Sequence, residues 1–146
     1  MESAGEALRQ LIASWAGDFG YLADHRFSFR FPEVVAARTP TYNPDCVWFE
    51  NKIEEPSTAA IFEIDEETSR KHCVGGASLA NVIALKYRKR LRYFAIVSRE
   101  RDVARTAIEI LRTHLGEKWA LEATVIPSFE PGVVRQSIEA VIPRRK

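Results

Sequence analysis

The sequence predicts an α/β fold of the α+β type, in which helices flank a mixed central sheet. Two observations predict this class. Three extended apolar segments follow an N-terminal helical pattern with ordinary loops between them, and helical patterns then alternate with buried strands. A three-strand meander followed by a crossover helix and a further strand gives a mixed sheet. At 146 residues with 46% hydrophobic content, the chain has the size of one domain.

The first helix is predicted by apolar residues that recur with a period near 3.6 from Ala7 to Phe19. Ser3 and Glu6 form a capping-box pattern before it, and Gly17 and Gly20 mark its end.

Three strands are expected next. Residues 26–31 alternate strictly between arginine or serine and phenylalanine, which predicts a strand with its three phenylalanines facing a core. Prolines frame a loop over 33–43, and the apolar runs 46–49 and 59–65 are read as neighbouring strands.

The second half is expected to alternate helices and strands. A helix follows Gly75-Gly76, with its apolar side formed by Leu79, Ala80, Val82, Ile83 and Tyr87. A buried strand over 91–97, a helix over 102–115 and a strand over 121–126 follow, with one short strand around 138–142. We expect one domain over 1–146, with a core of about 6–126 and a C-terminal extension over 127–146.

Composition argues for a soluble, cytoplasmic protein. No apolar run approaches the roughly 20 residues that cross a membrane, and the N-terminus lacks a signal-peptide pattern. The two cysteines, Cys46 and Cys73, lack metal-ligand spacing and are expected to be reduced, with Cys46 packed in the core.

Charge is distributed unevenly along the chain. Residues 1–67 hold 5 basic and 13 acidic side chains, whereas residues 68–146 hold 16 basic and 7 acidic ones. Such a molecule can bind a metal at its acidic part and a polyanion at its basic part.

Acidic residues interrupt two of the expected strands. Side chains alternate across a strand, so Glu63 and Asp65 point to one side, and a neighbouring strand would bring Asp45 beside Glu63. Carboxylates this close repel one another unless a cation offsets their charge. The alternatives are that Pro44-Asp45 is a simple turn and that Glu63 and Asp65 form a solvent face.

Pro44-Asp45 at the head of one strand and Glu63-Ile64-Asp65 in the next, with this order of elements, resembles the restriction-endonuclease-like superfamily of PD-(D/E)xK nucleases. The resemblance covers roughly residues 6–126. It implies an αβββαβ core and hydrolysis of phosphodiester bonds with Mg²⁺ or Mn²⁺.

The resemblance also implies roles for individual residues. Asp45, Glu63 and Asp65 would form the catalytic set, and Asp45, Glu63 and the carbonyl of Ile64 would bind the metal. The family usually has lysine where this chain has Asp65. Lys71 is the nearest candidate for a migrated lysine, whereas Lys86 is expected to lie too far along its helix.

Two further residues have open roles. Glu6 is a candidate for the acid that the family's first helix sometimes adds to the site, or it completes the capping box. His72 follows Asp65 closely enough to approach the site, although a place on a surface loop is the interpretation we prefer for it.

Basic residues are candidates for nucleic-acid contacts. The predicted set is Arg26, Arg30, Lys86, Arg88, Lys89, Arg90 and Arg92. The alternative for the run after Lys86 is a favourable interaction with the helix dipole.

The preferred hypothesis is therefore a small metal-dependent DNA endonuclease that acts as a homodimer. The alternative is a non-catalytic nucleic-acid-binding or protein-interaction module on the same fold, and a third possibility is an unrelated α/β domain with surface acids.

Overall fold

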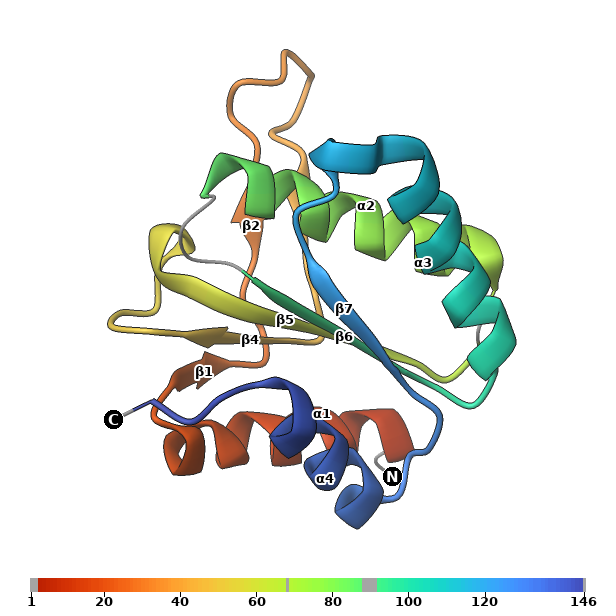
Figure 1. Cartoon of the computed structure of the whole chain (residues 1–146). Helices are drawn as coiled ribbons and strands as arrows, with labels where there is room; N and C mark the ends of the chain where they lie inside the picture. Colours follow the sequence, from red (N-terminus) through yellow and green to blue (C-terminus); the bar gives the residue numbers. More distant parts are fainter. Residues whose placement is uncertain (1–2, 68, 88–91, 146) are drawn as a thin grey trace.

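The computed structural model describes residues 3–67, 69–87 and 92–145. Its centre is a five-stranded sheet in the order β1-β4-β5-β6-β7 (Figure 1). The strands are β1 Leu22–Asp24, β4 Cys46–Phe49, β5 Thr58–Asp65, β6 Tyr93–Ser98 and β7 Glu122–Ile126. Strand β4 is antiparallel to β1 and to β5, whereas β5, β6 and β7 are parallel. The predicted mixed sheet is therefore confirmed.

Helices cover both faces of this sheet (Figure 1). One face carries α1 Ala4–Trp15 and α4 Pro131–Val141, and the other carries α2 Arg70–Lys86 and α3 Arg101–Leu115. Three short 3₁₀ helices, η1 Ala16–Phe19, η2 Glu55–Ser57 and η3 Gly116–Lys118, complete the described helices. No helix within the described ranges combines the length and apolar character needed to cross a bilayer.

Strand β5 is buried on both faces, which explains its continuously apolar start. Ile61 packs with α2 and α3, whereas its neighbour Phe62 packs on the face of α1 and α4. Glycine at position 20 ends η1 with a positive φ of 86°, a conformation that suits a residue without a Cβ.

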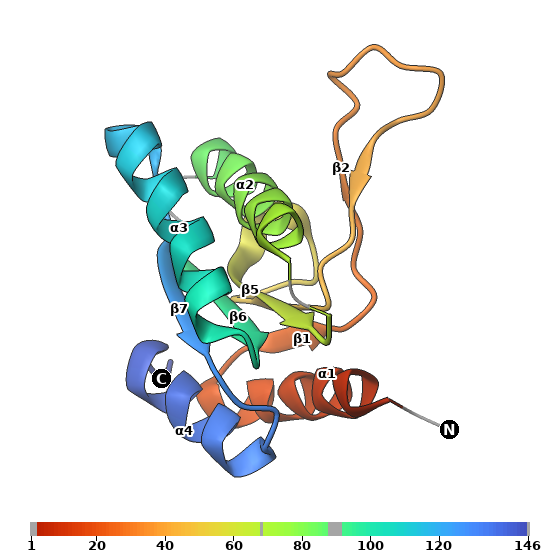
Figure 2. The same ribbon diagram turned by 90° about the vertical axis from the view of Figure 1, so that its right-hand side faces the viewer.

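The strand predicted over residues 26–31 is wrong in its extent and its partner. Only β2 Phe29–Arg30 forms a ladder, and it pairs with β3 Thr41–Tyr42 in a separate hairpin that projects from the domain (Figures 1 and 2). The alternation still reports burial, because Phe29 is buried and Arg30 is exposed. Burial of one face does not choose a hydrogen-bond partner, and the sheet is completed by the short β1 instead.

Two further expectations are corrected. The strand predicted around 138–142 is wrong, because that segment lies mainly in α4, whose Val134 and Ile138 are part of the core. On α2, Leu79 and Val82 are partly exposed, because small residues such as Ala80 and Ala84 form the buried side. Small residues allow α2 to lie close to the sheet.

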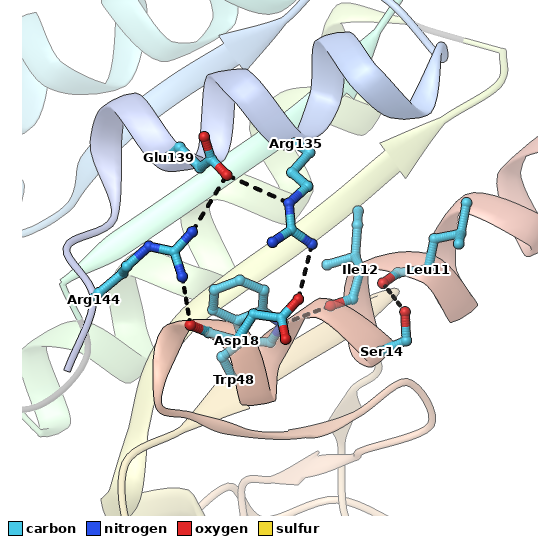
Figure 3. Close-up of polar contacts among 8 residues, drawn as sticks. All are labelled: Leu11, Ile12, Ser14, Asp18, Trp48, Arg135, Glu139 and Arg144. Atoms are coloured by element: carbon cyan, nitrogen blue, oxygen red, sulfur yellow. Dashed lines mark hydrogen bonds and ion pairs between the residues drawn. The ribbon is translucent and has the colours of Figure 1, made fainter. Parts of the chain in front are cut away.

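Polar contacts join α4 to the first helical segment (Figure 3). Arg135 bridges Asp18 at 3.0 Å and Glu139 at 3.4 Å, and Arg144 donates to the Asp18 carbonyl at 2.6 Å. Beneath them, the indole N–H of buried Trp48 donates to the Ile12 carbonyl at 3.1 Å. Exposed ion pairs contribute little, so the apolar side of α4 supplies most of the attachment.

Ile138→Ala should lower the free energy of unfolding by about 2–5 kcal/mol, because it removes a fully buried side chain and leaves a cavity. Val133→Ala on the same helix, where the side chain is 36% exposed, is the control and should change it by about 0.5 kcal/mol or less. Urea denaturation measures both. Equal effects would mean that α4 does not belong to the core.

Candidate functional site

Asp45 and Glu63 lie side by side where β4 begins and β5 ends. Cys46 pairs with Phe62, which places the preceding Asp45 next to the last residues of β5. The backbone N–H of Ile64 donates to Asp45 Oδ2 at 2.7 Å, and the backbone N–H of Asp45 donates to Glu63 Oε1 at 3.3 Å. Asp45 therefore joins the two strands and is more than a turn residue. We name Asp45, Glu63 and Asp65 the acid site.

Glu63 and Asp65 do not form a solvent face, so that alternative is wrong. Glu63 is 8% exposed and Asp65 is 4% exposed, and both project toward α2. The expected alternation holds, because the intervening Ile64 packs on the opposite face with α1 and α4.

Burial makes the ionised form of Glu63 unfavourable. It raises the pKa of Glu63 to about 8, and the negative charges of Asp45 and Asp65 act in the same direction. The buried hydroxyl of Tyr42 lies in the same environment, and its pKa is raised by burial and then by Glu63. A bound cation at this position would favour the ionised carboxylate.

Helix α2 approaches Glu63 at a glycine. A Cβ built on Gly76 would lie 2.5 Å from Glu63 Oε2, which is closer than real Cβ contacts come. The absence of a side chain at Gly76 therefore leaves the space that the carboxylate occupies.

Asp65 is held by two neighbours on the first turns of α2. The Cys73 thiol donates to Asp65 Oδ2 at 3.3 Å, and His72 Nε2 lies 3.3 Å from Asp65 Oδ1. Burial raises the pKa of Asp65, while the Cys73 hydrogen bond and His72 act against that shift. Burial also raises the pKa of the Cys73 thiol to about 12, so Cys73 is a donor to Asp65.

Arg9 of α1 forms an ion pair with Asp45 Oδ1, and its buried Nε has no hydrogen-bond partner among the described residues. We did not predict this contact. A signal was present, because Arg9 is the only lysine or arginine in the first 25 residues. The guanidinium supplies one positive charge to the acid site.

The N-terminus of α1 also reaches this region. The backbone N–H of Glu6 donates to Ser3 Oγ at 3.1 Å, which confirms the Ser3 cap. Glu66 Oε1 accepts from the Gly5 N–H at 2.5 Å, and a carboxylate there interacts favourably with the helix dipole. The side chain of Glu6 lines the adjacent cleft, so its role as an accessory acid stays a prediction.

Two clefts meet at the acid site, with volumes of about 550 and 580 Å³. Asp45 and His72 line both of them. The first is also lined by Glu6, Arg9, Ile64, Asp65, Glu66 and Glu67, and the second by Tyr42, Asn43, Glu63, Lys71, Gly75 and Gly76. Lys71, the predicted migrated lysine, therefore borders the same cleft as Glu63.

Of the basic residues predicted to bind nucleic acid, those that the structure describes line neither cleft at the acid site. The backbone N–H of Arg92 donates to Ala59 O, near the start of β5 and about 20 Å along the strand from Asp65. Lys86 lies 3.9 Å from Glu55 at that same end, Arg26 is exposed before β2, and Arg30 is exposed in β2 of the projecting hairpin. Arg88, Lys89 and Arg90 lie outside the described residues.

A divalent cation fits part of this donor set. No group of three or more His, Cys, Asp or Glu side chains among the described residues is arranged to hold a metal. Asp45 and Glu63 do supply carboxylate oxygens, which hard cations prefer. The N–H and C=O of one strand residue point to the same edge, so the Ile64 carbonyl faces the side where its N–H meets Asp45.

Comparison with protein-family models, with curated proteins and with solved structures found no match for this chain. Its function therefore has to be inferred from the acid site and the clefts beside it.

Glu63→Gln should remove a pH dependence of stability. Between the ordinary carboxyl pKa of 4.5 and about 8, the folded state holds a proton that the unfolded state releases. The free energy of unfolding of the wild type should therefore fall as pH rises through this range, by at most about 4 kcal/mol. Denaturant titrations from pH 5 to 8.5 measure it. Glu122→Gln, an exposed strand acid, should keep the wild-type slope.

Gly75→Ala and Gly76→Ala form a matched pair on α2. A Cβ at Gly75 would meet no described atom within 4 Å, so alanine there should stabilise the helix by about 0.5–1 kcal/mol. Alanine at Gly76 must displace the Glu63 carboxylate and should leave the protein about 1–2 kcal/mol less stable than its neighbour variant. Equal thermal unfolding midpoints would contradict the close packing described above.

Proposed function

We propose that this protein is a nuclease that hydrolyses phosphodiester bonds in DNA with Mg²⁺ or Mn²⁺ held by Asp45, Glu63 and the Ile64 carbonyl. The observation that carries the proposal is a pair of adjacent carboxylates, Asp45 and Glu63, that borders a cleft at the carboxyl end of a central strand. Ligands of open α/β sheets bind at that end of the strands.

The order of elements supports the proposal. Helix α1, strands β1, β4 and β5, helix α2 and strand β6 follow one another as the resemblance to PD-(D/E)xK nucleases implies, apart from the inserted hairpin. The family's ligand positions then correspond to Asp45 and Glu63, which are neighbours here.

The bound cation would lower the pKa of a water molecule and offset charge on the scissile phosphate. The protein's own residues would position the cation and balance the charges around it. The cation would attract the Glu63 and Asp45 carboxylates, which otherwise repel one another. Arg9 would then no longer pair with Asp45 and would face the cleft.

The first turn of α2 provides an anion-binding end beside the acid site. The N–H groups of this turn carry partial positive charge, and the turn holds Arg70, Lys71 and His72 with no acidic residue. Basic residues are normally disfavoured at a helix N-terminus, so their presence suits a phosphate in the adjacent cleft. This contact would give affinity without reading sequence.

One observation favours a second candidate, a non-catalytic nucleic-acid-binding or protein-interaction module. Arg9 already pairs with Asp45 and supplies the positive charge that a cation would otherwise bring. In that case the fold would keep the acid site as a structural element. This candidate requires no metal and no hydrolysis.

The two candidates differ in cation dependence. The nuclease should cleave DNA only with Mg²⁺ or Mn²⁺, and Asp45→Asn or Glu63→Gln should lower the rate at least about 100-fold. Either ion should also raise the thermal unfolding midpoint of the wild type through linkage, but not that of Glu63→Gln. Asp102→Asn, an exposed change on α3, should leave both readouts unchanged. Wild-type cleavage by both acid-site variants would refute the nuclease.

A homodimer is part of the proposal, because one acid site per chain cuts one strand and two are needed for a duplex. Light scattering should give twice the monomer mass of 16.6 kDa. A monomeric protein that nicks one strand of DNA would refute the homodimer but leave the proposed hydrolysis standing.

A further inference from the structure

We propose that His72 accepts the proton of the attacking water and that Asp65 orients it for this task. This inference rests on the proposed hydrolysis. In this proposal, His72 on α2 takes the role of the lysine that the family usually has at the position of Asp65.

The geometry separates the two ends of the imidazole. Nε2 lies 3.3 Å from Asp65 Oδ1, so this nitrogen faces the carboxylate and Nδ1 is the ring nitrogen on the other side of the imidazole. Asp65 is itself held in place by the Cys73 thiol at its other oxygen. The carboxylate side chain is 2% exposed and the imidazole 65% exposed, so a buried acid supports a base that is accessible to water.

The backbone fixes the position of His72. Ser69 caps α2 by accepting from the His72 N–H at 3.1 Å, which holds this residue in the first turn. His72 borders both clefts and so lies where they meet. Lys71 and Arg9 each border only one of the two clefts.

Several charged groups surround this position and would influence a pH profile. Those that line the two clefts are Glu6 and Arg9 of α1, Asp45 before β4, Glu63 and Asp65 of β5, Glu66 and Glu67 of the following loop, and Lys71 of α2. Cys73 contacts Asp65 from α2. Among the charged groups of the described residues, Asp65 is the one that contacts the imidazole, with Nε2 3.3 Å from Oδ1.

The step adds water across a P–O bond. A water O–H bond breaks, its proton goes to His72 Nδ1, and the water oxygen bonds to phosphorus. The bond from phosphorus to the leaving sugar oxygen breaks, and that oxygen takes a proton from solvent. The imidazolium then returns its proton to solvent, and the Asp65 carboxyl group holds the ring in position.

The test compares His72→Gln with the wild type and with His114→Gln, an exposed histidine on α3. Single-turnover cleavage of a DNA duplex with saturating Mn²⁺ should fall about 100-fold or more in His72→Gln and be unchanged in His114→Gln. Mn²⁺ affinity, measured by calorimetry without DNA, should stay within about twofold of wild type in both variants. Imidazole in the buffer should restore part of the cleavage by His72→Gly.

Three results would overturn the inference, and they are distinguishable from one another. Wild-type cleavage by His72→Gln would remove the proton-acceptor role and leave the nuclease intact. Loss of Mn²⁺ binding in His72→Gln would make His72 a metal ligand instead. Absence of cation-dependent cleavage by the wild type would refute the proposed function itself, and the role of His72 with it.

Discussion

The three carboxylates of the acid site, two of them at the buried end of β5, are the constraint on which its surroundings depend. A carboxylate removed from water needs hydrogen bonds or positive charge, or it takes up a proton. Each neighbour of the acid site meets part of this need. Arg9 brings a charge to Asp45, the backbone of Ile64 donates to Asp45, and the Cys73 thiol and His72 contact Asp65. Glu63 receives the least compensating charge and hydrogen bonding, and its pKa is raised to about 8.

The sheet topology brings these groups together from distant parts of the chain. Strand β4 enters antiparallel to β5, so its first residues lie at the carboxyl end of β5, and α2 begins just beyond that end. The parallel β6 then requires α2 to return along the sheet. This places the first turn of α2 at the acid site and its last turn, with Lys86, at the far end. Helix α1 adds Arg9 from the first segment of the chain.

Local preferences are broken where the clefts meet and hold elsewhere. Acids interrupt an apolar strand, basic residues occupy the first turn of α2, and a glycine lies within a helix against a carboxylate. Natural sequences depart from such preferences mainly at functional sites. By contrast, α3 has Asp102 as well as Arg101 in its first turn, basic residues in its last turn and a glycine at its C-cap, an arrangement closer to what helix stability favours. The contrast with α3 supports a functional role for the acid site.

The sequence by itself determined the class of fold and most of its elements. The period of 3.6 residues located α1 and α3, and continuous apolar runs located β4, β5, β6 and β7. It also placed Asp45 beside Glu63, because two neighbouring strands with a short connection leave few registers that bury their apolar residues. Periodicity reports burial, and burial follows directly from side-chain chemistry.

Only the tertiary structure decided which elements pair and which charges meet. Residues 26–31 alternate like a sheet strand, yet the short β1 fills that place, and the apolar segment near Ile138 became the helix α4. Arg9, Gly76 and His72 reach the acid site from helices whose packing depends on the whole core. The Arg9 and Gly76 contacts join residues far apart in the chain, so no local pattern specifies them, whereas His72 lies only a few residues after Asp65 and its approach was anticipated. The sequence therefore sets which acidic residues are present, and the tertiary structure sets which residues contact them.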